Sequence, residues 1–158
     1  MRIIIEGCDG TGKSTLVDGL AKEFNLGKIH ISNKDPNDLD FYYQFLRKDD
    51  VIFDRNLIGE MIYPKIFNRP QKLKEYELDY LMAKAKELNI HIIVLTAAID
   101  TINFRLKQDE FSVVRKNLDF IDNEFLKYAG KYNIPVINTS KHGIDETLEE
   151  AKCIIKHS

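Results

Sequence analysis

The feature of this sequence that most constrains its fold is a glycine-rich turn between an apolar run and a helical pattern. Arg2–Glu6 is a short run of the kind found in buried strands, and Gly7–Ser14 follows it with the spacing G-x-x-x-x-G-K-S. Leu16, Leu20 and Phe24 then recur with the period of an amphipathic helix. This order predicts an α/β fold with the turn at the carboxyl end of a parallel strand.

The rest of the chain repeats this alternation of strand and helix. Further apolar runs typical of strands lie at Lys28–Ser32, Val51–Asp54, His91–Thr96 and Ile134–Asn138. Helical stripes lie between and after them, with apolar positions at Leu73, Tyr76, Tyr80, Leu81, Ala85 and Leu88; at Leu118, Ile121, Phe125, Tyr128 and Tyr132; and at Ile144, Leu148, Ala151 and Ile155. Because the strand runs are continuously apolar, helices should cover both sheet faces, which predicts a three-layer fold with a five-stranded parallel sheet.

Length and composition restrict the class of protein. The chain has 158 residues with no linker-like segment or internal repeat, which predicts one domain over residues 1–158. Its two cysteines, Cys8 and Cys153, lie at opposite ends, so we expect reduced thiols and a cytoplasmic location. The first apolar run is too short for a signal peptide or a membrane span. A net charge of −2 argues against a nucleic acid polymer as partner.

The glycine-rich turn Gly7–Ser14 has the composition of a phosphate site and is called the phosphate loop below. Glycines let several backbone N–H groups point inward, and the N-terminus of the following helix adds partial positive charge. Lys13 should bridge the outer phosphates and act in catalysis, and Ser14 should ligate magnesium. The expected ATP-binding residues are Gly7, Gly10, Thr11, Gly12, Lys13, Ser14 and Thr15. A turn that only joins strand to helix is the alternative, but it gives no reason for Lys13 and Ser14.

A second polar site is predicted where Val51–Asp54 ends and Arg55 follows. The carboxyl ends of parallel strands meet at one sheet edge, so Asp54 and Arg55 should lie near Lys13. Asp54 suits the water shell of a magnesium ion, and the planar guanidinium of Arg55 suits a phosphate. A surface salt bridge is the alternative. Glu6 could orient Arg55, help activate a nucleophile or be a structural partner, and the sequence leaves all three open.

The chain contains the segment Glu6–Thr15, then the pair Asp54-Arg55, and then Glu60 and Tyr63. In this order, these residues resemble the thymidylate kinase family of nucleoside monophosphate kinases, in a compact form like those that phages encode. The resemblance implies a P-loop kinase fold and phosphoryl transfer from ATP, with Mg²⁺ as cofactor, to a deoxynucleoside monophosphate. The expected reaction converts dTMP to dTDP. Family members are commonly dimers, which makes a homodimer an expectation here.

The resemblance also implies roles for single residues on the acceptor side. Asp9 would bind the 3′-hydroxyl of the acceptor sugar. Arg55 would bind the acceptor phosphate and act in catalysis, with Asp54 beside it as a further residue of the substrate site. Tyr63 would crowd the 2′ position and so favour deoxyribose. Spacing alone makes Tyr63 an aromatic residue on a helix, for which core packing is the alternative.

The resemblance is looser where the acceptor base would bind. Cellular family members stack thymine on a phenylalanine and contact it with an arginine, both before the Asp-Arg pair. Here that segment offers Phe41, Tyr42, Tyr43 and Arg47, and a helix running back from the second strand would carry Arg47 to the wrong end of the sheet. Phe41 or Tyr42 is therefore the expected stacking residue and Arg69 the expected base contact, with an aromatic core cluster as the alternative.

A basic segment, residues 105–116, is predicted to form a lid. Cations on a mobile segment stabilise the charge that phosphoryl transfer spreads over three oxygens. In the related kinases an arginine at the Arg105 position begins this lid, and the lid supplies a catalytic arginine when the phosphate loop has none. Because the loop has Gly10 at that place, Arg105, Lys107 and Arg115 are the catalytic candidates, and Arg105 is also expected to contact ATP. Solvated helix charge is the alternative.

Two other functions compete with the monophosphate kinase. A deoxynucleoside kinase would use a similar loop but would need Glu6 or Asp54 to deprotonate a 5′-hydroxyl. A module that binds or hydrolyses ATP would need no such acceptor. Asp9 and Arg55 favour the monophosphate. Similar kinases place adenine against the turn Thr139–Gly143, and the four histidines are expected to be structural or surface groups.

Overall fold

The computed structural model describes residues 1–55, 57–106 and 112–157. The strands of its five-stranded sheet are β1 (Arg2–Gly7), β2 (Gly27–His30), β3 (Val51–Asp54), β4 (His91–Thr96) and β5 (Val136–Asn138). Its helices are α1 (Lys13–Phe24), α2 (Leu39–Leu46), α3 (Leu57–Ile66), α4 (Glu75–Glu87), α5 (Ile99–Arg105), α6 (Ser112–Lys116), α7 (Leu118–Tyr132) and α8 (Ile144–His157).

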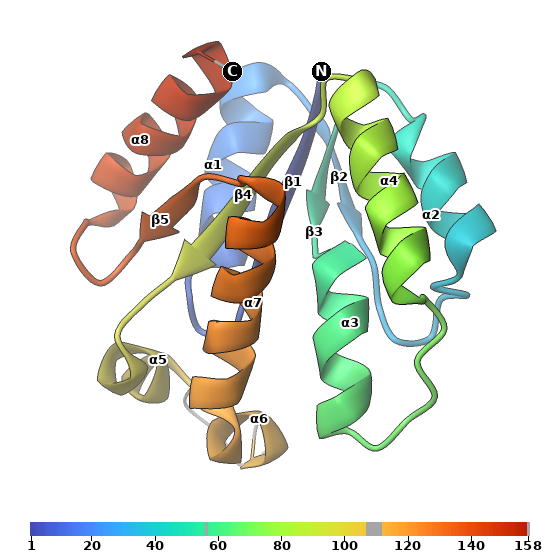
Figure 1. Ribbon diagram of the computed structural model, residues 1–158. Coiled ribbons are helices and arrows are strands. Elements are labelled where there is room, and N and C mark those ends of the chain that lie inside the picture. The colour runs from blue at the N-terminus through green and yellow to red at the C-terminus, as the bar shows by residue number, and fades with distance from the viewer. Residues whose placement is uncertain (56, 107–111, 158) are drawn as a thin grey trace.

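The strands are all parallel and lie in the order β2-β3-β1-β4-β5 (Figure 1). The register pairs Ile5 of β1 with Asp54 of β3, and Gly7 of β1 with Leu95 of β4. The carboxyl ends of these three strands therefore meet at one edge of the sheet. The phosphate loop and Asp54 lie at that edge, as expected for a ligand site in an open parallel sheet.

Helices cover both faces of the sheet because side chains alternate along the central strand. Ile3 and Ile5 of β1 belong to a buried core that α1 and α8 cover, whereas Ile4 belongs to a larger core under α2, α3, α4 and α7. Figure 1 shows these two helix layers on opposite sides of the sheet. The prediction of a three-layer α/β fold with a five-stranded parallel sheet is confirmed.

Some of the predicted core positions are wrong. Leu81 and Ala85 of the predicted stripe on α4 are buried, but Tyr76 and Tyr80 are 65% and 44% exposed, because the buried face of that helix runs through Leu78 and Met82 instead. Ile144, at the first position of α8, is 70% exposed. None of the described helices is long and apolar enough to cross a membrane.

The predicted lid begins at Arg105, the last residue of α5, and ends at Lys116, the last residue of α6. The part between these helices, residues 107–111, lies outside the described residues, and so does the candidate Lys107.

Candidate active site

The phosphate loop joins β1 to α1 with a backbone that requires glycine. Gly7, Gly10 and Gly12 have φ values of 139°, 79° and 92°, a region that other residues rarely adopt. A Cβ atom on Gly7 would lie 2.4 Å from the carbonyl oxygen of Leu95 on β4. The loop is therefore fixed by the neighbouring strand as well as by its own conformation.

Lys13 points back into this loop. Its side chain is buried, and its Nζ donates a hydrogen bond to the carbonyl oxygen of Cys8 at 2.7 Å, as does the Thr11 hydroxyl. Burial lowers the pKa of Lys13, and the nearby Asp9 carboxylate opposes that shift. Burial also raises the pKa of the Cys8 thiol to about 12, so Cys8 packs as a small apolar group.

Ser14 and Asp54 form an oxygen-rich pair beside Lys13. The Ser14 hydroxyl donates to Asp54 Oδ2 at 3.1 Å. Asp54 Oδ1 is buried and has no hydrogen-bond partner within the described part of the chain. No group of three or more His, Cys, Asp or Glu side chains among the described residues is arranged to hold a metal ion. The pair would therefore suit a cation that takes its other ligands from water and phosphate, as Mg²⁺ does.

Asp9, Arg55 and Tyr63 come together on the other side of the loop. The Tyr63 hydroxyl donates to Asp9 Oδ2 at 2.9 Å, and Arg55 Nη2 donates to Asp9 Oδ1. Burial opposes the charge of Arg55, but the carboxylates around it, Asp9 first, outweigh that effect and raise its pKa. Arg55 also adopts a left-handed backbone, with φ of 67°, which is uncommon outside glycine and is often found at functional sites.

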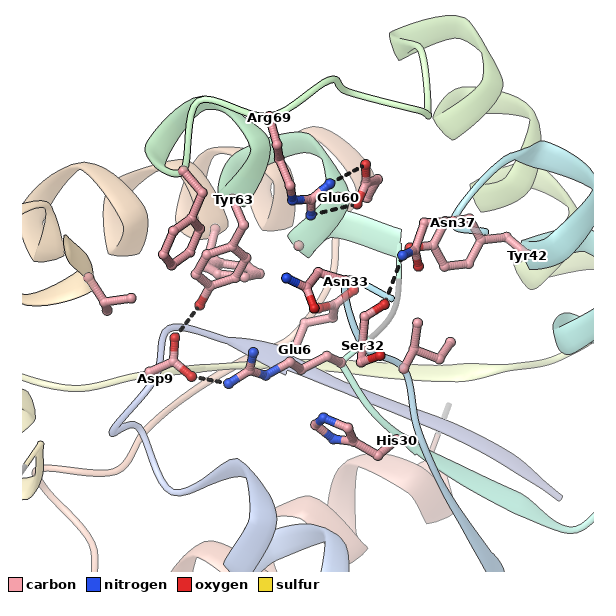
Figure 2. A pocket seen from close by; sticks show the side chains of 16 residues that line it. Glu6, Asp9, His30, Ser32, Asn33, Asn37, Tyr42, Glu60, Tyr63 and Arg69 are labelled. Atoms are coloured by element: carbon pink, nitrogen blue, oxygen red, sulfur yellow. Dashed lines mark hydrogen bonds and ion pairs between the residues drawn. The ribbon is translucent and has the colours of Figure 1, made fainter. Parts of the chain in front are cut away.

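These three residues line a cavity of about 260 Å³, called the Asp9 cavity (Figure 2). Its walls come from β1, the phosphate loop, the end of β2 and the segment after it, the residue after β3, the helices α2, α3, α6 and α7, and the connection from α3 to α4. The lining residues are Glu6, Asp9, His30, Ile31, Ser32, Asn33, Asn37, Tyr42, Arg55, Gly59, Glu60, Tyr63, Phe67, Arg69, Val114 and Phe125.

The Asp9 cavity brings Tyr42 and Arg69 to the site but not Phe41. The Phe41 ring packs on Phe45, at 4.4 Å between ring centroids, and does not line the cavity. Arg47 also lies outside it, with its guanidinium 5.8 Å from the centre of the Tyr43 ring. An aromatic residue of the cavity wall that sequence reasoning missed is Phe67, which is 50% exposed and stacks on Tyr63. Its position four residues after Tyr63 was the available signal.

Glu6 and His30 also line the Asp9 cavity. Glu6 Oε1 accepts a hydrogen bond from the backbone N–H of Ile58 at 2.8 Å, at the N-terminus of α3, where a negative charge is stabilising. This contact supports the structural role among the three left open for Glu6. His30, expected to be structural or on the surface, lines the cavity with Nδ1 3.5 Å from Asp54 Oδ2.

A second cavity of about 250 Å³, called the Thr139 cavity, lies between α1 and the turn after β5. Its lining residues are Gly12, Thr15, Leu16, Gly19, Arg105, Thr139, His142, Gly143, Ile144, Thr147 and Leu148. The phosphate loop contributes to both cavities, with Asp9 lining one and Gly12 lining the other. This arrangement offers separate places for two ligands beside the phosphate loop.

Of the two described lid candidates, Arg105 lies at a cavity and Arg115 does not. Arg105 donates to the Thr139 hydroxyl at 2.9 Å, to the Thr139 carbonyl at 3.1 Å and to the Gly10 carbonyl at 3.3 Å. It thus bridges the phosphate loop and the turn after β5. Arg115 donates to the carbonyl of Leu106 and lines neither cavity.

The chain is similar in sequence to two proteins that are assigned as kinases. No family model matches the sequence. A protein assigned as an adenylate kinase in Sulfurisphaera tokodaii is 36% identical, but the match covers only 46% of this chain and 46% of that protein, so the chain spans about half of it. A protein assigned as a thymidylate kinase in Methanocaldococcus jannaschii is 25% identical over 95% of this chain and 93% of its own length.

Solved structures share the fold along the whole chain. The YorR protein of Bacillus subtilis, in complex with phosphorylated GDP, matches with a TM-score of 0.85 at 23% identity and covers 99% of this chain and 96% of its own. Thymidylate kinase from Candida albicans matches at 0.69, with 16% identity and coverage of 99% and 91%. Deoxyadenosine kinase from M. mycoides with bound dCTP matches at 0.64, with 16% identity and full coverage of both chains. The chain therefore has the fold of P-loop kinases.

Proposed function

We propose that this chain transfers the γ-phosphoryl group of ATP to a deoxynucleoside monophosphate, with dTMP as the expected acceptor. The observation that supports this most is the grouping of Asp9, Arg55 and Tyr63 in a cavity directly beside the phosphate loop. The long match to a protein assigned as a thymidylate kinase supports the same acceptor class.

The donor would occupy the phosphate loop and the Thr139 cavity. Backbone N–H groups of the loop and the N-terminus of α1 would bind the β- and γ-phosphates, with Lys13 on the transferred group. The nucleoside would lie towards the turn after β5, where Arg105 and Thr139 contact each other. In this position Arg105 is also close enough to the loop to neutralise phosphate charge, because it already contacts the carbonyl of Gly10.

The acceptor would occupy the Asp9 cavity with its phosphate towards Arg55. The guanidinium would bind that phosphate, Asp9 would accept from the 3′-hydroxyl, and Tyr63 would fill the space beside the 2′ carbon. A phosphate acceptor is already an anion, so positioning and charge neutralisation suffice and no strong base is needed. Of the two carboxylates that could serve a nucleoside kinase as base, Glu6 accepts a hydrogen bond from the N–H of Ile58 and Asp54 accepts one from the Ser14 hydroxyl.

Ser14 and Asp54 fit a magnesium ion, since the pair offers hard oxygen atoms and one of them, Asp54 Oδ1, is buried without a hydrogen bond from the described residues. When bound, the ion would neutralise charge on the donor phosphates. Asp54 also lies in register with Ile5 of β1, so the strand pair holds its carboxylate beside the phosphate loop.

A ligand panel distinguishes this function from its two rivals. A ligand that binds only the folded state raises the melting temperature, so we expect stabilisation by ATP with Mg²⁺ and by dTMP, and product formation from the two together. Stabilisation and product formation with thymidine instead of dTMP would contradict the proposal in favour of a nucleoside kinase. ATP hydrolysis without transfer to any acceptor would favour the binding module.

Arg55→Ala tests which ligand that arginine binds. Removal of the guanidinium should weaken dTMP binding and leave ATP binding close to that of the wild type, because the side chain faces the Asp9 cavity. Arg47→Ala is the matched control, since Arg47 lies outside both cavities. Titration of both ligands into all three proteins provides the measurement, and loss of ATP affinity with unchanged dTMP affinity would contradict the assignment.

A further inference from the structure

Thr139, the first residue after β5, connects Arg105 to the phosphate loop. Its hydroxyl accepts from Arg105 Nη1 at 2.9 Å and donates to the carbonyl oxygen of Thr11 at 2.8 Å. Its backbone carbonyl accepts from Arg105 Nη2 at 3.1 Å, and its backbone N–H donates to the Thr96 carbonyl, at the end of β4, at 2.9 Å. Thr139 is 6% exposed. One buried residue therefore contacts α5, the phosphate loop and the neighbouring strand.

The surroundings of the Thr139 hydroxyl fix the direction of its hydrogen bonds. Arginine has donors only, so the hydroxyl oxygen must be the acceptor towards Arg105. The single hydroxyl proton then goes to a carbonyl oxygen, and that of Thr11 at 2.8 Å is closer than that of Thr96 at 3.4 Å. The branch at Cβ restricts rotation of the side chain. The hydroxyl is therefore held in one orientation before any ligand binds.

The hydrogen bonds continue through the phosphate loop to Lys13. Thr11 is fully buried, and its hydroxyl donates to the carbonyl oxygen of Cys8 at 2.7 Å. The same carbonyl accepts from Lys13 Nζ at 2.7 Å. Thr139 thus attaches Arg105 to the peptide groups that also hold Lys13, and the two positive charges are positioned by one network.

This network orients Arg105 without neutralising it. Among the described residues, the hydrogen bonds of its guanidinium go to two carbonyl oxygens and one hydroxyl, which are uncharged. The arginines of the Asp9 cavity are held differently, Arg55 by the carboxylate of Asp9 and Arg69 by that of Glu60. A carboxylate cancels much of the field of a guanidinium, whereas uncharged oxygens leave that field available to a ligand.

We infer that Thr139 is a positioning residue for phosphoryl transfer, whose hydroxyl holds the charge of Arg105 against the phosphate loop. The direct contact of Arg105 with the loop, at the Gly10 carbonyl, is 3.3 Å and so longer than either of its bonds to Thr139. Loss of the hydroxyl should therefore loosen Arg105, and a cation that must reorganise stabilises a transition state less well. The inference rests on the proposed function and gives a role in it to a residue that acts through Arg105.

Thr139→Val and Thr139→Ser separate the hydroxyl from the shape of the side chain. Valine can neither accept from Arg105 nor donate to Thr11, so at saturating ATP we expect kcat for transfer to dTMP to fall by about tenfold or more, the usual effect of losing a hydrogen bond to a charged group. KM for dTMP should stay near that of the wild type, because Thr139 does not line the Asp9 cavity. Serine keeps the hydroxyl and should restore most of kcat. Thr101→Val, on α5 but outside both cavities, is the matched control.

Arg105→Met shows whether the hydroxyl acts through Arg105. Methionine is similar in length to arginine but has no donors, so in this background Thr139→Val should change kcat little, and the effects of the two substitutions should not add. The melting temperature reports separately the effect of leaving the Thr11 carbonyl without its donor. If Thr139→Val does not fold, Thr139→Ala gives the same comparison with a smaller side chain.

ATP hydrolysis without an acceptor, measured on the same variants, separates this inference from the proposed function. Wild-type protein that hydrolyses ATP but transfers nothing to dTMP would overturn the function, and the same pattern of variants in the hydrolysis rate would still support the role of Thr139. Equal kcat in Thr139→Val and wild type, a loss that serine does not restore, or an equal loss in the Arg105→Met background would overturn the role of Thr139 and leave the function standing. Absence of both reactions in the wild type would overturn both.

Discussion

Lys13 carries its positive charge at a buried position in the phosphate loop, where burial disfavours the charged form. Its side chain is buried, its Nζ is held by the Cys8 carbonyl, and the Asp9 carboxylate helps to keep it protonated against the effect of burial. A charge already desolvated and oriented does not need to reorganise when negative charge develops on a transferred phosphoryl group. Under the proposed function, we therefore expect Lys13 to act by electrostatic stabilisation.

Lys13→Ala should abolish phosphoryl transfer while leaving the fold intact. Loss of one preorganised donor typically costs about 3 kcal/mol, or about 10²–10³-fold in kcat, and loss of a full charge should cost at least as much. Single-turnover assays measure the loss, and the melting temperature and circular dichroism spectrum check the fold. Turnover within about tenfold of the wild type would rule out the phosphate loop as the catalytic centre.

Tyr63 packs in the core and also lines the Asp9 cavity. It is 8% exposed, its ring packs on Phe67 and Phe125, and its hydroxyl donates to Asp9. The alternatives of core residue and sugar contact are therefore compatible, and substitution can separate the contributions of bulk and hydroxyl.

Replacement of Tyr63 by Phe and by Ala should affect sugar selection unequally. Ala opens the space beside the 2′ carbon, so it should relax the preference for deoxyribose more than Phe does. Phe removes the donor to Asp9, which costs about 1–3 kcal/mol, and should mainly weaken binding of both sugars. The ratio of kcat/KM for dTMP to that for its ribose counterpart decides between them. An equal ratio in all three proteins would leave Tyr63 as a packing residue only.

Among the elements, the junction of β1 with the phosphate loop is the most tightly constrained. Gly7 has a φ of 139°. The carbonyl group of Leu95 lies so close to it that there is no room for a Cβ atom. The strand pair β1–β4 therefore sets where the loop begins.

Gly7→Ala should destabilise the protein by at least about 2 kcal/mol, from backbone strain and from the clash with β4. Gly130→Ala on α7 is the contrasting variant, because a Cβ atom there meets no atom within 4 Å and alanine favours a helix by about 0.5–1 kcal/mol. Chemical denaturation of both variants should give shifts of opposite sign. Equal stability of Gly7→Ala and wild type would show that β4 can move away.

The elements differ in how well the sequence predicts them. The apolar run Val51–Asp54 is the strand β3 itself, because a buried strand in a parallel sheet needs nothing but continuous apolarity. The predicted run Ile134–Asn138 forms a strand only from Val136, and Pro135 just before it lacks a backbone donor. Tyr76 and Tyr80 mislead because tyrosine suits both core and surface, so the stripe on α4 fits more than one phase.

The same distinction applies to the site. The contact of Ser14 with Asp54 is predictable, since Asp54 ends one buried parallel strand and Ser14 follows the neighbouring strand after a short loop, at the same edge of the sheet. The pairing of Glu60 with Arg69 depends on the path of the chain after α3. The contact of Arg105 with Thr139 joins residues that are 34 positions apart. No local sequence pattern encodes either contact. Sequence reasoning therefore named several residues of the cavity walls, among them Tyr42, Tyr63 and Arg105, but not the contacts that hold them in place.

Across the whole molecule, the helix layer over the larger core is tied together by charge as well as by apolar packing. Lys131, near the end of α7, contacts Glu75 at 2.9 Å and Asp79 at 2.7 Å on α4. The hydroxyls of Tyr128 and Tyr132 donate to the same two carboxylates. Hydrogen bonds from Lys131, followed by those from the tyrosines, lower the pKa of Glu75 and of Asp79 below their ordinary values of 4.5 and 3.8.

This cluster should make part of the stability depend on pH in the acid range. A carboxyl group with a lowered pKa in the folded state contributes stability that is fully present above its unfolded pKa and is lost as the pH falls through its folded pKa. The double variant Glu75→Gln/Asp79→Asn should therefore be less stable than wild type at neutral pH, and the difference should disappear below the lowered pKa values. Because both carboxylates are about half exposed, the difference should be small and should shrink with added salt. Urea denaturation at neutral and at acid pH measures it, and a gap that persists when both carboxyl groups are protonated would mean that the two positions act through packing instead.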